Sequence, residues 1–292
     1  MLADLLLPWQ LLAVLATMVY GVMNFLYKVA AVRGASSFYL MSFSGMTVAL
    51  FAGTTVAATG SSFERPGQLF VLAAVNSLFF ATGSIFKIEA LRFLPANVTF
   101  PVVKLNSVIA VIIAMVVFSE RPSILQYLGI GLGILVILQL SFDQTNKDGE
   151  TIVNYRKGIL FALGAAFSTA ISMTMGKIAS THVHRLNYIF ISYSLVAVYT
   201  LISTRAKKSE AARFNAATAI FGVLIGSLNF LGYYLVLLAF SRGPMSGVQP
   251  IFAMSIIIPI VLAGLLYHER FTWRRATAVA LSLVSILLIS LH

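Results

Sequence analysis

Long apolar segments separated by short polar loops follow one another along the whole 292-residue chain. Most of them approach the ~20 residues that a helix needs to cross about 30 Å of hydrocarbon. The segments are apolar on every side and lack period-two alternation, which excludes membrane-spanning β-strands. The pattern therefore predicts an all-α integral membrane protein with ten transmembrane helices, at about residues 8–32, 37–58, 67–90, 95–119, 122–142, 158–178, 187–204, 216–240, 244–267 and 271–291.

The second half of the chain repeats the first. Residues 90–121 and 239–270 each begin with Ala, contain two prolines in register, continue in an apolar run and end in Glu-Arg. The offset is the same at each match (239 − 90 = 149) and extends well beyond this stretch. Other matched pairs are Pro95 and Pro244, Pro101 and Pro250, Lys28 and Lys177, Tyr39 and Tyr188, and Gly83 and Gly232. A gapless register of this length predicts two tandem copies.

The predicted copies are a first five-helix repeat at 1–142, a polar linker at 143–157 and a second five-helix repeat at 158–292. Five crossings are an odd number, so the second copy enters the membrane from the opposite side. The repeat is therefore expected to be inverted about a pseudo-two-fold axis in the membrane plane. Two such halves can open a central cavity first to one side and then to the other, which is alternating access.

Composition supports this class. The chain is 59% hydrophobic and 10% charged, with a mean hydropathy of +0.94, and soluble proteins average about 25% charged residues. The net charge of +11 does not predict a nucleic-acid partner, because the basic residues are scattered over short loops. The expected surroundings are the lipid bilayer. Cysteine is absent, which excludes disulfides and thiolate metal sites.

Basic residues are distributed unevenly between the two predicted sides. Twelve Lys and Arg lie in loops after the odd-numbered helices, and four lie in the other loops. The positive-inside rule then places the first set in the cytoplasm and both termini outside.

The spaced prolines with a closing Glu-Arg, together with Lys-x-Ala near residues 28 and 177, resemble the EamA domain pairs of the drug/metabolite transporter superfamily. The second copy, at residues 243–273, is closest to the family pattern, whereas Lys104 departs from it in the first. The resemblance implies a ten-helix carrier with a central cavity lined by helices 1, 3, 4, 6, 8 and 9. Its implied cargo is amino acids, other metabolites or drugs. It also implies cytoplasmic termini, opposite to the charge count.

Lys104 is the principal candidate for binding substrate. It lies nine residues after Pro95, roughly 13 Å from the nearer end of its predicted helix, and burying a lysine at that depth is costly. One interpretation is that it holds an anionic group such as a carboxylate. The other is that it reaches the interface or caps a carbonyl freed by Pro101. Asn106 is expected to point elsewhere on the helix.

Three further groups of residues are predicted from the pattern. Lys28 and Lys177 are repeat equivalents expected near opposite mouths, where they attract anions or close a gate, and Pro101 and Pro250 are candidate gating breaks. Lys87 and Glu89 are expected to pair locally or to face solvent. Candidates for the cavity wall are neutral residues, for which hydrogen bonding between helices is the alternative: Tyr20, Asn24, Asn76, Asn229, Tyr233 and Gln249.

The nine acidic residues all lie outside the middles of the predicted helices. This disfavours a proton-coupled cation antiporter, which needs a central carboxylate. The four histidines lie at loops or the chain end, so neither an enzyme nor a metal or other cofactor is predicted.

The predicted function is a secondary transporter, an exporter or facilitator of small metabolites, most of all amino acids or related carboxylates. It is expected as a monomer or homodimer in the inner membrane of a bacterium or archaeon. Alternatives are a multidrug or cation efflux carrier and, less favoured, a non-transporting receptor or an intramembrane enzyme.

Overall fold

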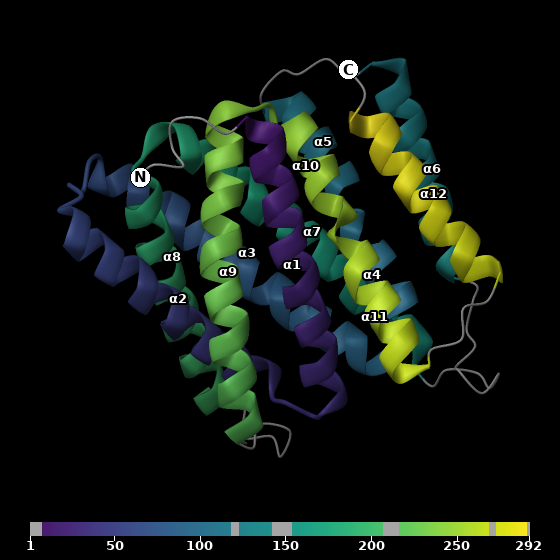
Figure 1. Ribbon diagram of the computed structural model, residues 1–292, viewed down its shortest axis with the longest axis horizontal. Helices are drawn as coiled ribbons and strands as arrows, with labels where there is room; N and C mark the ends of the chain where they lie inside the picture. The colour runs from purple at the N-terminus through teal and green to yellow at the C-terminus, as the bar shows by residue number, and fades with distance from the viewer. Residues whose placement is uncertain (1–7, 118–122, 142–153, 207–215, 269–272, 291–292) are drawn as a thin grey trace.

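A computed structural model describes residues 8–117, 123–141, 154–206, 216–268 and 273–290, which form a bundle of helices without strands in those ranges (Figure 1). The helices of the first copy are α1 (Trp9–Val32), α2 (Ser37–Thr59), α3 (Pro66–Phe93), α4 (Ala96–Lys104), α5 (Asn106–Val117) and α6 (Ile124–Ser141). Those of the second copy are α7 (Tyr155–His182), α8 (Arg185–Ala206), α9 (Ala216–Arg242), α10 (Met245–Ala253), a short 3₁₀ turn η3 (Met254–Ile256), α11 (Ile257–Tyr267) and α12 (Trp273–Ser290).

Seven helical stretches within the described ranges are long and apolar enough to cross a membrane. They are α1, α2, α3, α7, α8, α9 and the run Gly247–Tyr267. The chain is therefore a multi-pass, all-helical membrane protein. Each of the ten predicted segments contains helix, although α7 begins at Tyr155 and so includes the last residues of the predicted linker.

The predicted helices at 95–119 and 244–267 are each interrupted, which corrects the expectation of single helices. In the first copy the break falls at Leu105, whose backbone N–H bonds to the Val102 carbonyl at 3.2 Å instead of the carbonyl four residues back. In the second copy η3 occupies the matching position. Pro101 and Pro250 each precede the break within α4 and α10, and a proline removes one donor from the helical ladder.

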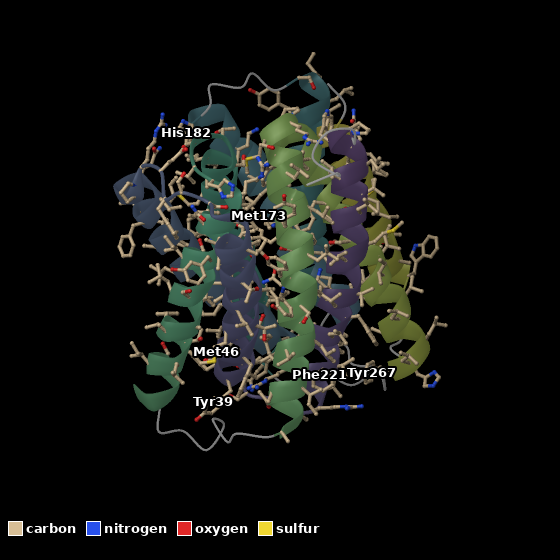
Figure 2. All side chains as sticks on the ribbon, turned by 60° about the vertical axis from the view of Figure 1, so that its left-hand side comes forward. Tyr39, Met46, Met173, His182, Phe221 and Tyr267 are labelled. Carbon is tan, nitrogen blue, oxygen red and sulfur yellow. The ribbon has the colours of Figure 1, made fainter. Side chains whose placement is uncertain are left out.

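The helices pair as an inverted repeat requires. The contacts of α1 with α9 match those of α3 with α7, while α2 packs on α8 and α6 on α12. In Figure 1, α1 descends from the upper end of the bundle while α7 rises towards it. Figure 2 agrees for α7, since His182 at its end lies high, whereas Tyr267 at the end of α11 lies low. The buried core runs between α1, α2, α3, α8 and α9.

Candidate functional site

A small cavity lies where the two copies meet, beside the breaks of both interrupted helices. Its volume is about 40 Å³, and since a water needs roughly 10–15 Å³, it has room for a few waters. The lining residues come from α1, α3, α4, α5, α7 and α10: Tyr20, Met23, Asn24, Phe80, Ser84, Lys87, Phe100, Val103, Lys104, Asn106, Thr169, Met173 and Phe252.

Three pairs of lining residues are related by the repeat offset. Thr169 matches Tyr20 (169 − 20 = 149), Met173 matches Asn24 and Phe252 matches Val103. The cavity therefore lies on the pseudo-two-fold axis. Binding sites of inverted-repeat transporters are commonly built at this position, from discontinuous helices.

Lys104 is buried, with 8% of its surface exposed, and it lines the cavity at the end of α4. Its Nζ lies 3.5 Å from the Phe252 carbonyl oxygen, a long hydrogen bond, and 4.2 Å from the centre of the Phe252 ring. Both contacts reach across to the second copy. One interpretation of the sequence expected Lys104 to cap a carbonyl freed by Pro101. Lys104 does contact a carbonyl, but that carbonyl belongs to α10 and not to its own helix.

Lys87 also lines the cavity, which corrects the expectation that it pairs locally with Glu89 or faces solvent. Its Nζ donates to Asn24 Oδ1 at 3.2 Å and lies 4.1 Å from the centre of the Tyr27 ring. Glu89 instead accepts from Ser37 and pairs with Arg92 at 3.2 Å. The helix continues to Phe93, so Lys87 lies well inside it.

Asn106 faces the same cavity as Lys104, although uninterrupted helical geometry predicted otherwise. The break at Leu105 changes the direction of the following residues. Asn106 is 2% exposed, and its Oδ1 accepts no hydrogen bond from the described residues. A buried acceptor in this state is available to a ligand or water.

Of the neutral residues predicted for the wall, Tyr20 and Asn24 line the cavity, both from α1. Asn24 Oδ1 accepts from Lys87, while the Tyr20 hydroxyl donates to Asn229 Oδ1 at 3.0 Å. Tyr20 therefore borders the cavity and also hydrogen-bonds to a second polar region.

That second region is a layer of buried tyrosines and amides between α1, α3, α7, α8 and α9. Asn229 Nδ2 donates to the Tyr193 hydroxyl at 2.9 Å. Asn76 Oδ1 accepts from Ser172 at 2.7 Å and from Tyr233 at 3.3 Å. Asn76, Asn229 and Tyr233 thus make the interhelical hydrogen bonds that were the alternative to cavity lining.

The sequence matches the EamA-like transporter family over residues 7–142 and 156–291, one match to each copy. The chain belongs to this family. One protein of known crystal structure is similar over 94% of this chain and 97% of its own, with a TM-score of 0.67 and 15% sequence identity. That similarity shows the fold alone. A comparison with curated proteins gives no match.

The remaining predicted residues of this EamA-like transporter lie outside the cavity lining. Lys177 Nζ donates to the carbonyls of Phe240 at 2.6 Å and Gly243 at 2.9 Å, so it caps the end of α9. Lys28 is buried, and its Nζ lies 6.0 Å from the centre of the Tyr267 ring at the lower end of the bundle (Figure 2). The gating roles of Lys28, Pro101 and Pro250 stay predictions.

Gln249 of the EamA-like transporter is 1% exposed on α10, and neither its Nε2 nor its Oε1 has a hydrogen-bond partner in the described residues. It lies three residues before Phe252 and therefore near the same helix face. It does not line the cavity in this conformation.

Two histidines lie at and just after the end of α7. His182 Nδ1 lies 2.9 Å from the Ile178 carbonyl oxygen, within its own helix. Partial burial and the neighbouring Arg185 lower the pKa of His184, which favours its neutral form, while Glu64 opposes the shift. Within the described ranges no three potential ligands gather at a metal site.

Sequence reasoning missed Lys87, Asn106 and Phe252. The spacing of Asn76, Phe80, Ser84 and Lys87 is helical and could have placed Lys87 on the inner face of α3. The direction of Asn106 depends on the break at Leu105, for which only Pro101 gives a signal. Phe252 contacts Lys104 through the packing of one copy on the other, which a single sequence does not show.

Proposed function

We propose that this EamA-like membrane transporter is a ten-helix secondary carrier, an exporter or facilitator, for small metabolites that bear a carboxylate. Amino acids and related carboxylates are the proposed cargo, and the inner membrane of a bacterium or archaeon is the proposed location. Transport would proceed by alternating access of the two inverted copies to the axial cavity.

The observation that carries this proposal is the chemistry of the cavity. Lys104 and Lys87 both line it, and the described part of its lining contains no acidic side chain. The described ranges hold two acidic residues: Glu64 lies in an exposed loop, and Glu89 of α3 pairs with Arg92 outside the cavity lining. A carboxylate would stabilise the buried ammonium groups, whereas a cationic drug would add to their repulsion.

The long contact of Lys104 also favours a binding role. A hydrogen bond of 3.5 Å to a neutral carbonyl is weak, and a carboxylate offers a shorter, charge-assisted one. Substrate can therefore displace the Phe252 carbonyl at small cost. Lys177 differs, because its contacts of 2.6 and 2.9 Å are already those of a capped helix end.

Counterflow uptake into proteoliposomes tests the proposal, with labelled amino acids, organic anions and quaternary cations as cargo. We expect carboxylate exchange by the wild type and at least a tenfold loss in Lys104→Gln. The matched control is Lys157→Gln, because Lys157 is an exposed lysine outside the cavity lining. Exchange of cations alone, or normal carboxylate exchange by Lys104→Gln, would contradict the proposed substrate class.

A further inference from the structure

Two lysines of the first copy line one cavity, and neither has a charged counterpart in the second copy. Lys87 and Lys104 correspond to Val236 (87 + 149 = 236) and Ala253 at the repeat offset. Positive charge at the axis therefore comes from one half only. We propose that the cavity binds organic dianions with an acidic group at each end, such as dicarboxylates, in preference to zwitterionic amino acids; this rests on the proposed function and narrows its substrate class.

Charge balance is the first reason. Burial of an ammonium group within a membrane is costly unless an opposite charge accompanies it. The described lining offers two ammonium groups and no carboxylate, so a substrate with one negative charge leaves one of them uncompensated. A zwitterion brings its own ammonium group and leaves the net charge of the site unchanged. A dianion compensates both lysines.

The two ammonium groups are held separately, which suits a ligand with two acidic ends. Lys87 extends from α3 and is oriented by Asn24 and the Tyr27 ring of α1. Lys104 extends from α4 and contacts Phe252 of α10. The Lys87 amine therefore contacts residues of the first copy, and the Lys104 amine contacts a residue of the second copy.

Helix dipoles do not change the sign of the site. The carboxyl end of α4 and the amino end of α5 meet at Leu105, so their partial charges of opposite sign largely offset each other. The lysine charges then decide which ligands are attracted.

The walls favour an organic dianion over an inorganic one. Phe80, Phe100, Met173 and Phe252 contribute apolar surface to the same lining. A carbon skeleton between two acidic groups would contact this surface, whereas sulfate would leave it without a partner.

The test is counterflow by the full chain in proteoliposomes, with succinate, glycerol 3-phosphate, lactate and alanine as labelled probes. We expect exchange of succinate to exceed that of lactate and alanine at least tenfold. Glycerol 3-phosphate carries both charges on one group, so we expect it to exchange less than succinate. Lys87→Gln should lower succinate exchange at least tenfold. It should also lower the ratio of succinate exchange to lactate exchange, because only one positive charge remains in the cavity.

Three further measurements keep the result interpretable. Lys87→Arg retains the charge and should keep more dianion exchange than Lys87→Gln, while Lys157→Gln is the surface control. Thermal stabilisation of the wild type by each probe in detergent reports binding without transport. Exchange of alanine or lactate with no exchange of succinate would overturn this inference and leave the carboxylate carrier intact. Exchange of tetraphenylphosphonium alone would overturn both.

Discussion

Depth in the membrane does not by itself make a lysine a substrate ligand in this protein. Lys177 is a membrane lysine whose amine is fully engaged in short bonds to the end of α9. Lys104 and Lys87 differ because they line the cavity between the two copies. Lys177 and the two cavity lysines therefore differ in what the neighbouring helices place beside the amine, and this depends on how the helices pack.

Asn229 should stabilise the buried polar layer. Asn229→Ala leaves the hydroxyls of Tyr20 and Tyr193 without their amide partner, and both tyrosines are buried. Interhelical bonds of this kind contribute about 0.6–1.7 kcal/mol in membranes, so we expect a loss of about 1–2 kcal/mol for the pair. Thermal unfolding in detergent measures it. Ser227→Ala is the control, since Ser227 bonds only within its own helix, to Val223; equal melting temperatures for the two variants would contradict the role of Asn229.

At this scale the sequence predicted which polar residues are buried better than it predicted what they touch. Tyr20 and Asn24 are four residues apart on α1, and both line the cavity as expected. Asn76, Asn229 and Tyr233 are buried as well, but each makes hydrogen bonds to residues of other helices. Helical spacing gives the face of a helix, whereas the partner facing it comes from packing that a single sequence does not contain.

Small residues determine how closely the helices approach at the level of elements. Gly222 and Gly226 lie four residues apart on α9 and face α2. A Cβ atom on Gly226 would lie 2.7 Å from Thr47 Cβ and 2.8 Å from the Ser44 carbonyl oxygen. Small residues at this spacing allow two membrane helices to approach closely.

Gly226→Ala should therefore loosen the packing of α2 on α9. The added Cβ meets backbone that cannot rotate away, and overpacking of this kind costs about 1–3 kcal/mol. We expect a lower melting temperature in detergent. Gly131→Ala is matched to it, because a Cβ on Gly131 of α6 would meet no atom within 4 Å and helix propensity alone favours alanine. The idea fails if the two variants melt alike.

The helices themselves were largely predictable, and their interruptions were not. Hydropathy placed α1 at 8–32 and the structure has it at Trp9–Val32, because a membrane span is set by length and apolarity. Pro101 and Pro250 indicated that the ladder would weaken, yet each break falls several residues later, at Leu105 and at η3. Its position determines that Asn106 faces the cavity, and so part of the site was beyond prediction.

At the scale of the whole molecule, the inverted repeat places a close contact between a large side chain and a glycine at each end of the bundle. In both contacts the first copy supplies the large side chain and the second copy supplies the glycine. At the upper end, a Cβ on Gly243 would lie 2.7 Å from the Trp9 indole. At the lower end, a Cβ on Gly158 would lie 2.6 Å from Leu94 Cγ. The offset relates these pairs, since 158 − 9 = 149 and 243 − 94 = 149. Both ends are therefore tightly packed around a cavity that holds only a few waters.

Alternating access requires each of these contacts to separate in turn, and the chain is suited to test this because it has no cysteine. We expect that Trp9→Cys with Gly243→Cys, or Leu94→Cys with Gly158→Cys, can be oxidised to a disulfide, since a Cβ on each glycine would lie 2.6–2.7 Å from the Cγ atom of its partner. Each disulfide should abolish counterflow, and reduction should restore it, because a carrier locked shut at one end cannot release substrate there. The four single-cysteine variants are the controls. If fully crosslinked protein exchanges substrate as fast as the uncrosslinked protein, the crosslinked end need not open during transport. If that holds at both ends, the carrier does not work by alternating access of its two copies.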